Sequence, residues 1–273
     1  MGPMVRKVWI GIGGPLAVAA LALGQAATAS AAVAAPVGAT ATLNCSATYV
    51  PPPSSVTLTL RSTGKYVTAL QQRLTCLHYW VGGIDGKFGP DTLFAVWAFK
   101  EVQAGRYAPA NPDVVDAATQ RQLVSPKTPP VRHPGGGATR IEVNKTLQVL
   151  VLYKNGKPWL ISHVSTARHC LPGQGCQWYT PNGRYHAEAF MPGWVTVPLG
   201  RMYNPVFFIR LVYAIHGDSN PAYPTDLSGV ALVPASHGCV RMPLDLAKTF
   251  HTYLKIASGT AGTPVFIDGP KYQ

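Results

Sequence analysis

The sequence predicts a two-domain α + β protein, in which a small three-helix domain precedes a larger, mainly β domain. Three observations predict this architecture. Residues 32–56 and 125–138 are rich in proline and small residues, which is typical of extended linkers. Between them, apolar residues recur at the spacing of a helix with one buried face. Beyond the second linker come short runs of β-formers bounded by turn residues. With 273 residues, the chain has room for two domains.

Composition narrows the class of protein further. A hydrophobic fraction of 47% excludes a chain that is disordered throughout. Lys and Arg number 23 against 11 Asp and Glu, and the resulting charge of +12 favours an anionic environment. The basic residues are scattered, with no run of three, so the charge does not indicate a nucleic-acid partner. Anionic polymers of the cell envelope fit better, and a charge that only aids solubility is the alternative.

The first segment reads as a targeting signal rather than as part of a fold. Arg6 and Lys7 form a basic start, residues 8–23 are uncharged and mostly apolar, and small residues follow. A cut after Ala29 or Ala31 satisfies the pattern of a signal peptidase site, so residues 1–31 are predicted to be a signal peptide. An uncleaved membrane anchor is the alternative. No later stretch is long enough to span a membrane, so we expect a secreted or cell-wall protein without a transmembrane segment after cleavage.

Residues 57–124 read as helical. Val67, Leu70, Leu74 and Leu77 predict a helix with one apolar face. A turn-rich stretch, residues 82–92, carries a proline suited to the start of a second helix, whose apolar face follows it. A third, short helix is predicted over residues 116–123.

Three motifs in this region match a known module. They are Leu-Gln at 70–71, Asp-Gly-Lys-Phe-Gly-Pro-Asp-Thr at 85–92 and Ala-Val-Trp-Ala-Phe at 95–99. Together they resemble the three-helix peptidoglycan-binding domain, over residues 57–124, and the resemblance implies binding to peptidoglycan glycan. The sequence departs from that family at 111–116, where a second Asp-Gly turn is usual. A spacer that keeps the fold without binding sugar is therefore the alternative.

The residues beyond the second linker read as β. Residues 147–153 form a run of β-formers, Asn155-Gly156 predicts a tight hairpin turn, and residues 159–165 return. Further strands are predicted at 185–191, 206–209, 212–216 and 265–267. One helix is predicted over residues 243–254, with a buried stripe of apolar side chains at three- and four-residue spacing.

The stretch that indicates chemistry is Ala-Ser-His-Gly-Cys-Val-Arg-Met at 235–242. A thiol becomes a useful nucleophile beside a histidine that takes its proton, and in an extended segment Cys239 and His237 point the same way. Gly238 lets backbone N–H groups approach a reacting carbonyl. The helix predicted just after the stretch would favour a thiolate through its dipole. A second histidine, His216, ends an apolar strand and is followed by Gly217, so the residues alone leave two candidate bases.

His-Gly at 216–217 followed by Ser-His-Gly-Cys-Val-Arg-Met at 236–242 resembles the signature of the L,D-transpeptidase catalytic domain, the YkuD-like family. Val-Ser-Thr at 164–166, Thr-Pro-Asn-Gly at 180–183 and Phe207-Phe208 also match. The resemblance places the catalytic domain at residues 139–269 and implies a sandwich-like β fold. Residues 167–179 form an insertion that the family usually lacks.

The resemblance also implies roles for individual residues, by position. Because the family carries arginine in some members where this chain has His237, that histidine is expected to support the loop or the substrate rather than to act as the base. The catalytic residues implied are Cys239 as nucleophile, His216 as general base, Ser236 and His237 as supports, and the backbone around Gly238 and Cys239 as the oxyanion hole. Arg241 and Gly217 are expected to contact substrate, the former because its guanidinium fork binds carboxylates.

The implied reaction is acyl transfer on peptidoglycan stem peptides. Cys239 attacks the L,D peptide bond of a tetrapeptide stem, releases the terminal D-amino acid and forms a thioester. An amine on a second stem, expected to be that of diaminopimelate, then resolves it into a 3→3 crosslink. No cofactor, metal or nucleic acid is expected, and the protein is expected to be a monomer.

Three alternatives remain at this point. The same thioester could be resolved by water, which would make the protein an L,D-carboxypeptidase. The chain could bind the cell wall without catalysis. His216, His237 and Cys239 could instead form an open zinc site, although no fourth ligand is evident in the sequence.

Five cysteines leave one thiol over in an exported protein. The motif identifies that thiol as Cys239, and the other four then pair in one of three ways. The short loop between Cys170 and Cys176 favours a disulfide there, and Cys45–Cys76 follows by subtraction.

Overall fold

The computed structural model describes residues 43–46, 48–167, 178–218 and 230–270. The predicted signal peptide, residues 1–31, lies outside this range, as do residues 32–42 and 47 of the first linker and the cysteines at 170 and 176. Among the described residues, no helix is both long and apolar enough to cross a bilayer.

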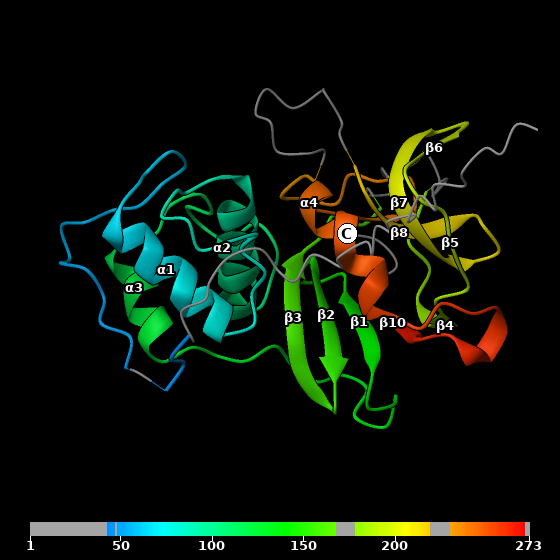
Figure 1. The fold of residues 1–273 in the computed structure, drawn as a ribbon, viewed down its shortest axis with the longest axis horizontal. Helices are drawn as coiled ribbons and strands as arrows, with labels where there is room; N and C mark the ends of the chain where they lie inside the picture. Colours follow the sequence, from blue (N-terminus) through cyan, green and yellow to red (C-terminus); the bar gives the residue numbers. More distant parts are fainter. Residues whose placement is uncertain (1–42, 47, 168–177, 219–229, 271–273) are drawn as a thin grey trace, which may run out of the picture. The chain divides into compact units, whose positions relative to one another are not determined.

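Three helices lie close to where the sequence predicts them (Figure 1): α1 (Lys65–Cys76), α2 (Pro90–Ala104) and α3 (Ala117–Val124). Helix α1 buries the predicted stripe of Val67, Leu70 and Leu74. Helix α2 begins on its proline, as its missing N–H allows. Helix α3 is capped by Asp116, whose carboxylate accepts the Thr119 N–H at 2.8 Å.

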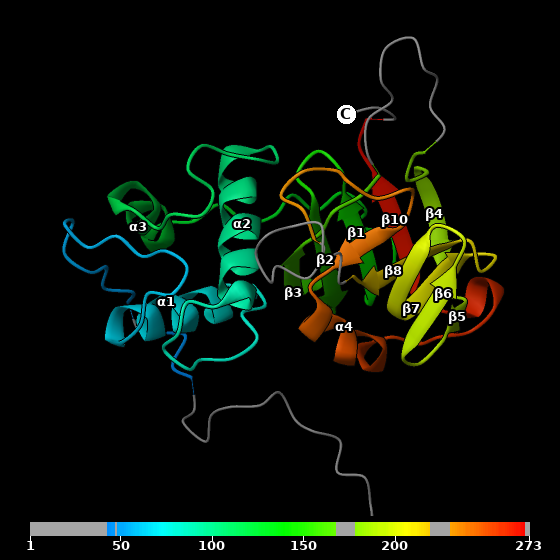
Figure 2. The same cartoon turned by 90° about the horizontal axis from the view of Figure 1, so that it is seen from above.

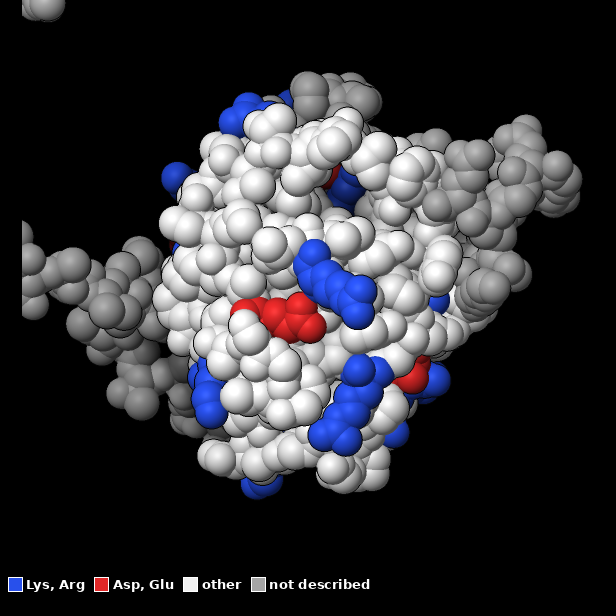
Figure 3. All heavy atoms as spheres, turned by 90° about the vertical axis from the view of Figure 1, so that its right-hand side faces the viewer, with Lys and Arg blue, Asp and Glu red and all other residues white. Residues whose placement is uncertain are grey.

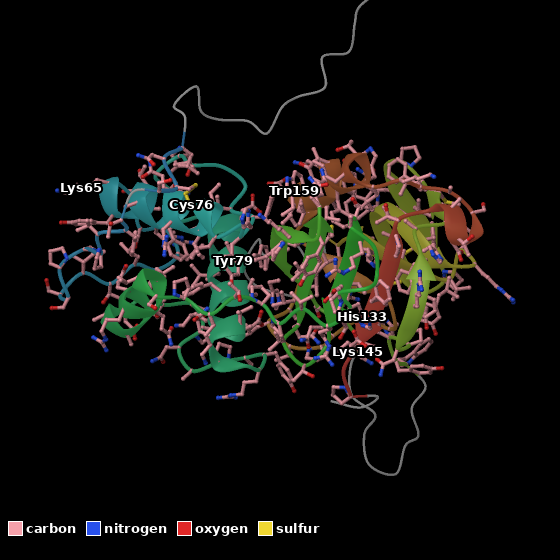
Figure 4. The ribbon with its side chains drawn as sticks, turned by 90° about the horizontal axis from the view of Figure 1, so that it is seen from below. Lys65, Cys76, Tyr79, His133, Lys145 and Trp159 are labelled. Carbon is pink, nitrogen blue, oxygen red and sulfur yellow. A yellow bond between two sulfur atoms is a disulfide. The ribbon has the colours of Figure 1, made fainter. Side chains whose placement is uncertain are left out.

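The predicted disulfide between Cys45 and Cys76 is confirmed. It joins the segment before the helices to the last residue of α1, which Figure 4 labels. Disulfides persist in oxidising compartments and are rare in the cytosol, so this bond agrees with an extracytoplasmic protein.

The remaining described residues form two mixed sheets. The first sheet has the order β3-β2-β1-β10-β4, and the second has the order β5-β7-β8-β9, with β6 paired to β7 (Figures 1 and 2). Two pairs are parallel, β1 with β10 and β8 with β9. The strands are β1 (Arg140–Asn144), β2 (Val149–Lys154), β3 (Lys157–His163), β4 (Gly183–His186), β5 (Ala189–Phe190), β6 (Trp194–Val197), β7 (Gly200–Ile209), β8 (Tyr213–Gly217), β9 (Val240–Met242) and β10 (Pro264–Asp268).

Strand β2 is buried on both faces, which explains its uninterrupted apolar sequence. Val149, Val151 and Tyr153 pack in the core that α1 and α2 line. Leu150 and Leu152 point the other way, into the core shared by the two sheets and helix α4 (Leu244–Phe250). The hairpin at Asn155-Gly156 is also as predicted, since both residues adopt the positive φ of a tight turn.

Three predicted elements differ from the structure. The strand predicted over 185–191 is divided, because β4 pairs with β10 in the first sheet and β5 pairs with β7 in the second. The chain passes from one sheet to the other at Ala187. The Ala187 N–H donates to the Thr263 carbonyl, and the Glu188 N–H donates to the carbonyl of Phe207 on β7. The helix predicted over 243–254 ends at Phe250 and continues as a 3₁₀ turn, His251–Tyr253. The strand predicted over 147–153 begins only at Val149, because Gln148 has a φ of +56°.

The segment 125–138, predicted to be a linker, is held by side chains near both ends. The Gln103 amide exchanges hydrogen bonds with the Lys127 backbone at 2.9 and 3.1 Å. The Glu142 carboxylate accepts the N–H groups of Arg132 and His133 at 3.0 and 3.1 Å. This stretch is therefore bound to both α2 and β1.

A buried Glu–His pair also joins α2 to β3. Glu101 Oε2 lies 2.9 Å from His163 Nδ1, and neither side chain is exposed. His163 Nε2 lies 2.9 Å from the carbonyl of Ala231. Burial raises the pKa of Glu101 well above its ordinary value and lowers the pKa of His163 to about 4. Both shifts favour neutral groups, so a protonated Glu101 donates to His163 Nδ1 and His163 Nε2–H donates to Ala231.

The neutral pair predicts how two substitutions of similar size differ. Glu101→Gln keeps an N–H donor for His163 Nδ1, so we expect the free energy of unfolding to change by less than about 1 kcal/mol. Glu101→Leu leaves that nitrogen buried and unpaired, which we expect to cost about 1–3 kcal/mol. Urea unfolding followed by tryptophan fluorescence measures both. A Gln variant as unstable as the Leu variant would mean that the pair is charged instead.

Candidate active site

A cavity of about 950 Å³ opens beside the second sheet. Its walls are largely apolar and come from the tip of the β6–β7 hairpin, from the β7–β8 turn and from Trp178. Polar side chains gather in the same cavity, namely His216, Asp218, Ser236, His237, Cys239 and Arg241. This volume suits a small ligand or a short length of peptide.

Two parallel strands bring the candidate residues together. His216 on β8 pairs directly with Arg241 on β9. Cys239 precedes Arg241 by two residues, and residues two apart in an extended chain point to the same face. Val240, between them, points into the core instead. Residues that are more than twenty positions apart in the sequence therefore line one cavity.

His216 is held as a neutral imidazole. Its Nδ1 lies 2.8 Å from the carbonyl oxygen of Gly217, which can only accept a hydrogen bond, so Nδ1 carries the proton. Nε2 is left as an acceptor. Burial lowers the pKa of His216 to about 4; the Gly217 carbonyl raises that pKa and the nearby charge of Arg241 lowers it. At neutral pH this side chain is ready to accept a proton.

Cys239 is the free cysteine of the described residues. Burial raises the pKa of its thiol, against smaller lowering effects from the Ala214 backbone and from Arg241. The sequence led us to expect a thiolate stabilised by the helix that follows. Strand β9 separates Cys239 from α4, and the thiol is the favoured form. The thiol and the imidazole are thus both neutral at rest.

The loop before Cys239 requires a glycine. Gly238 has a φ of +141°, and a Cβ at this position would lie 2.4 Å from the Tyr213 ring. The Ser236 hydroxyl holds the loop from inside, since it donates to the Cys239 carbonyl at 2.7 Å and accepts the Gly238 N–H at 3.1 Å. These bonds fix the shape of the loop, and the catalytic support expected of Ser236 stays a prediction.

Arg241 is already engaged by a carboxylate. Its Nε lies 2.9 Å from Asp218 Oδ2, and both side chains are 13% exposed. A substrate carboxylate would have to share or displace this partner. Sequence reasoning gave Asp218 no role, although it follows His216 by two residues and so lies at the end of the same strand.

Of the two other predicted residues, His237 lines the cavity and Gly217 does not. His237 is exposed and meets the Trp178 ring edge to face at 5.1 Å. Gly217 is buried against α4, where a Cβ would lie 2.9 Å from that of Ala247. Its carbonyl fixes His216, and its predicted contact with substrate stays a prediction. The predicted disulfide between residues 170 and 176 lies outside the described residues.

The zinc site considered as an alternative can be compared with the structure. Within the described ranges, no group of three or more His, Cys, Asp or Glu side chains is placed to hold a metal ion.

The face in Figure 3 carries few charged side chains, and they are scattered rather than gathered into a basic patch.

Comparisons with known proteins bear on this site. The family model that matches the chain describes the L,D-transpeptidase catalytic domain, YkuD, and covers residues 138–267. The crystal structure of the L,D-transpeptidase (residues 123–326) from Xylanimonas cellulosilytica is 30% identical and covers 80% of this chain and 100% of its own, with a TM-score of 0.64. The matched 80% of the chain is longer than the segment that holds the two sheets, so the similarity extends into the helical part.

Two further solved structures are more distant. The L,D-transpeptidase of Stackebrandtia nassauensis is 17% identical over 81% of this chain and 98% of its own, with a TM-score of 0.43. That of Mycobacterium smegmatis is 16% identical over 48% of this chain and 59% of its own, with a TM-score of 0.37. The comparison with curated proteins found no match.

Proposed function

Since this chain belongs to the L,D-transpeptidase family, we propose that it forms 3→3 crosslinks in peptidoglycan through a thioester on Cys239. The observation that carries the proposal is one cavity that holds both a free thiol, on Cys239 just before β9, and a neutral imidazole, on His216 of β8, whose Nε2 carries no proton. That pair is what nucleophilic acyl transfer requires.

The first step transfers an acyl group from the donor stem to the protein. Sγ of Cys239 attacks the carbonyl carbon of the L,D peptide bond while its proton passes to His216 Nε2. A C–S bond forms and the C–N bond breaks, and His216 returns the proton to the departing amine of the terminal D-amino acid. Because both groups are neutral at rest, proton transfer accompanies the attack and no thiolate needs to accumulate.

The second step releases the acyl group to another stem. The amine of an acceptor, which we assign to a diaminopimelate side chain, attacks the thioester carbonyl and loses a proton to His216. The new C–N bond replaces the C–S bond, and the thiol is regenerated.

The neighbouring residues take supporting roles in this proposal. Ser236 shapes the loop, and Gly238 gives the Cys239 N–H access to the developing oxyanion. Arg241 binds a carboxylate of the stem peptide, which takes the place of Asp218 in the ion pair. His237, exposed beside Trp178, contacts the substrate rather than the reacting proton.

Features outside the catalytic domain support a protein that acts on the cell wall. We assign residues 57–124 to a peptidoglycan-binding domain, on the motifs described above and on the three helices they form. We assign residues 1–31 to a signal peptide that directs export. The Cys45–Cys76 bond supports an oxidising compartment.

Purified tetrapeptide-bearing muropeptides test the function directly. Crosslinked dimers with a 3→3 linkage, identified by mass spectrometry and fragmentation, are the expected product, together with the released D-amino acid. Tripeptide monomers alone would identify a carboxypeptidase that passes the thioester to water. Unchanged substrate would leave a wall-binding protein without catalysis. The Cys239→Ala protein is the matched control, and full turnover by it would contradict catalysis through Cys239.

A further inference from the structure

The Thr180 hydroxyl joins two segments behind the candidate nucleophile. It donates to the carbonyl oxygen of Gly238 at 2.8 Å and accepts the N–H of Ala167 at 2.9 Å. Thr180 is 1% exposed and is not part of the cavity wall. The side chain therefore acts on the loop from behind and does not touch a ligand in the cavity.

The Gly238 carbonyl matters because it belongs to the same peptide unit as the Cys239 N–H. A peptide unit is planar and trans, so its C=O and N–H point in opposite directions, and fixing one aims the other. Gly238 has no Cβ to limit rotation of this unit, and its φ of +141° lies in a region that other residues avoid. A hydrogen bond to the carbonyl supplies the restraint that the glycine lacks.

The Cys239 N–H is the donor left available near the sulfur. The preceding N–H, that of Gly238, already bonds the Ser236 hydroxyl. For the Cys239 N–H, no acceptor is found in the part of the chain that the structure describes. An oxyanion that forms on a carbonyl attacked by Sγ needs such a donor.

Thr180 is itself held by a buried residue of the turn between β1 and β2. Lys145 Nζ donates to the Thr180 carbonyl at 2.9 Å, and Lys145 is 4% exposed (Figure 4). The Gln148 amide bonds the Lys145 carbonyl at 2.6 Å and the Thr166 hydroxyl at 2.9 Å. Thr166 in turn accepts the N–H groups of Ala235 and Ser236, each at 2.9 Å. The loop is thus anchored on both sides by one buried polar cluster.

We propose that Thr180 is a positioning residue for acyl transfer, because its hydroxyl fixes the Gly238–Cys239 peptide and so aims the Cys239 N–H at the oxyanion. The inference rests on the proposed function, since it concerns the same nucleophile. It adds a residue that lies 59 positions before Cys239 in the sequence and outside the cavity.

Two reactions of the Cys239 sulfur distinguish a Thr180 that aims the Cys239 N–H from a Thr180 that only stabilises the loop. Acylation by a carbapenem passes through an oxyanion, whereas alkylation by iodoacetamide displaces iodide at a saturated carbon and forms none. Thr180→Val removes the hydroxyl and keeps the shape. We expect its second-order rate constant for acylation, measured by intact mass, to fall about 10²–10³-fold, the loss typical of an oxyanion donor. The alkylation rate at Cys239 is expected to stay within about twofold of the wild type, because displacement of iodide needs no such donor.

Matched variants complete the test. Thr180→Ser restores the hydroxyl and is expected to restore acylation. Thr252→Val removes an exposed hydroxyl that donates to the Thr249 carbonyl far along the chain, and should change neither rate. If Thr180→Val does not fold, Thr180→Ala takes its place in both assays. Acylation at the wild-type rate in the Val or Ala variant, or an equal fall in both rates, would overturn the proposal.

Failure of the proposed function gives a different result. In that case wild-type Cys239 would be alkylated but not acylated, and the muropeptide assay would show no product. Failure of the Thr180 inference alone would leave the wild type active in both assays, with the Val variant either equal to it or slowed to the same extent in both.

Discussion

Replacing Cys239 with serine is expected to lower the rate of acylation by a carbapenem at least about 10³-fold, as the loss of an enzyme nucleophile does. An alcohol is far harder to deprotonate than a thiol, and the neutral His216, with its pKa near 4, is too weak a base to make up the difference. Intact mass spectrometry after a fixed incubation measures the fraction of protein that carries one adduct.

The variant should otherwise resemble the wild type. Cys239 is half-buried, and its long contact with the Val212 carbonyl, at 4.0 Å, contributes little to folding. We expect the melting temperature to stay close to that of the parent. An adduct of unchanged amount on Cys239→Ser would locate the acylated residue elsewhere and remove the basis of the proposed function.

The second large effect concerns the base. His216→Ala is expected to slow acylation by about 10²–10⁴-fold, which is the usual contribution of a general base. His237→Ala should stay within about tenfold of the wild type, because that imidazole is exposed and packs on Trp178. His216→Gln, which keeps most of the volume of the side chain, controls for the space left by alanine. A dead His237 variant beside an active His216 variant would reverse the two roles.

The pH dependence of the wild type follows from the same residue. His216 must be neutral to accept the thiol proton, and its pKa is lowered to about 4. Acylation should therefore hold its plateau as the pH falls from 7 toward 5 and decline only near pH 4. A decline centred near 6.5, the ordinary value for histidine, would show that the base is more exposed to water than the structure has it.

Local patterns in the sequence predict the elements that depend on nearby residues. The helix at 65–76, the hairpin at 155–156 and the strands that end at Ile209 and Gly217 all follow from periodicity and turn chemistry. Strand β1 was missed because Arg140 and Glu142 make it read as exposed. They are buried and form an ion pair at 2.7 Å, with Arg140 over the Tyr153 ring. The charges alone do not reveal that both side chains are buried.

The residues of the candidate site also fall into those that a local motif predicts and those that only the fold brings together. Cys239, His216 and Gly238 carry their chemistry in a short motif, so residue type and spacing suffice to find them. Asp218 and Thr180 contact partners 23 and 58 positions away, Arg241 and Gly238, and only the folded chain brings these together. The expected thiolate rests on a helix dipole alone, whereas burial of the sulfur raises the pKa of the thiol.

The burial of strand β2 on both faces bears on how this protein can be divided for experiments. The family match begins at residue 138, beyond all three helices. A fragment cut there would uncover Val149, Val151, Tyr153 and Ile161, which now pack in the core lined by α1 and α2. Such a contiguous apolar face promotes self-association. The smallest unit fit for expression or for building chimeras therefore begins before α1 and keeps the Cys45–Cys76 bond.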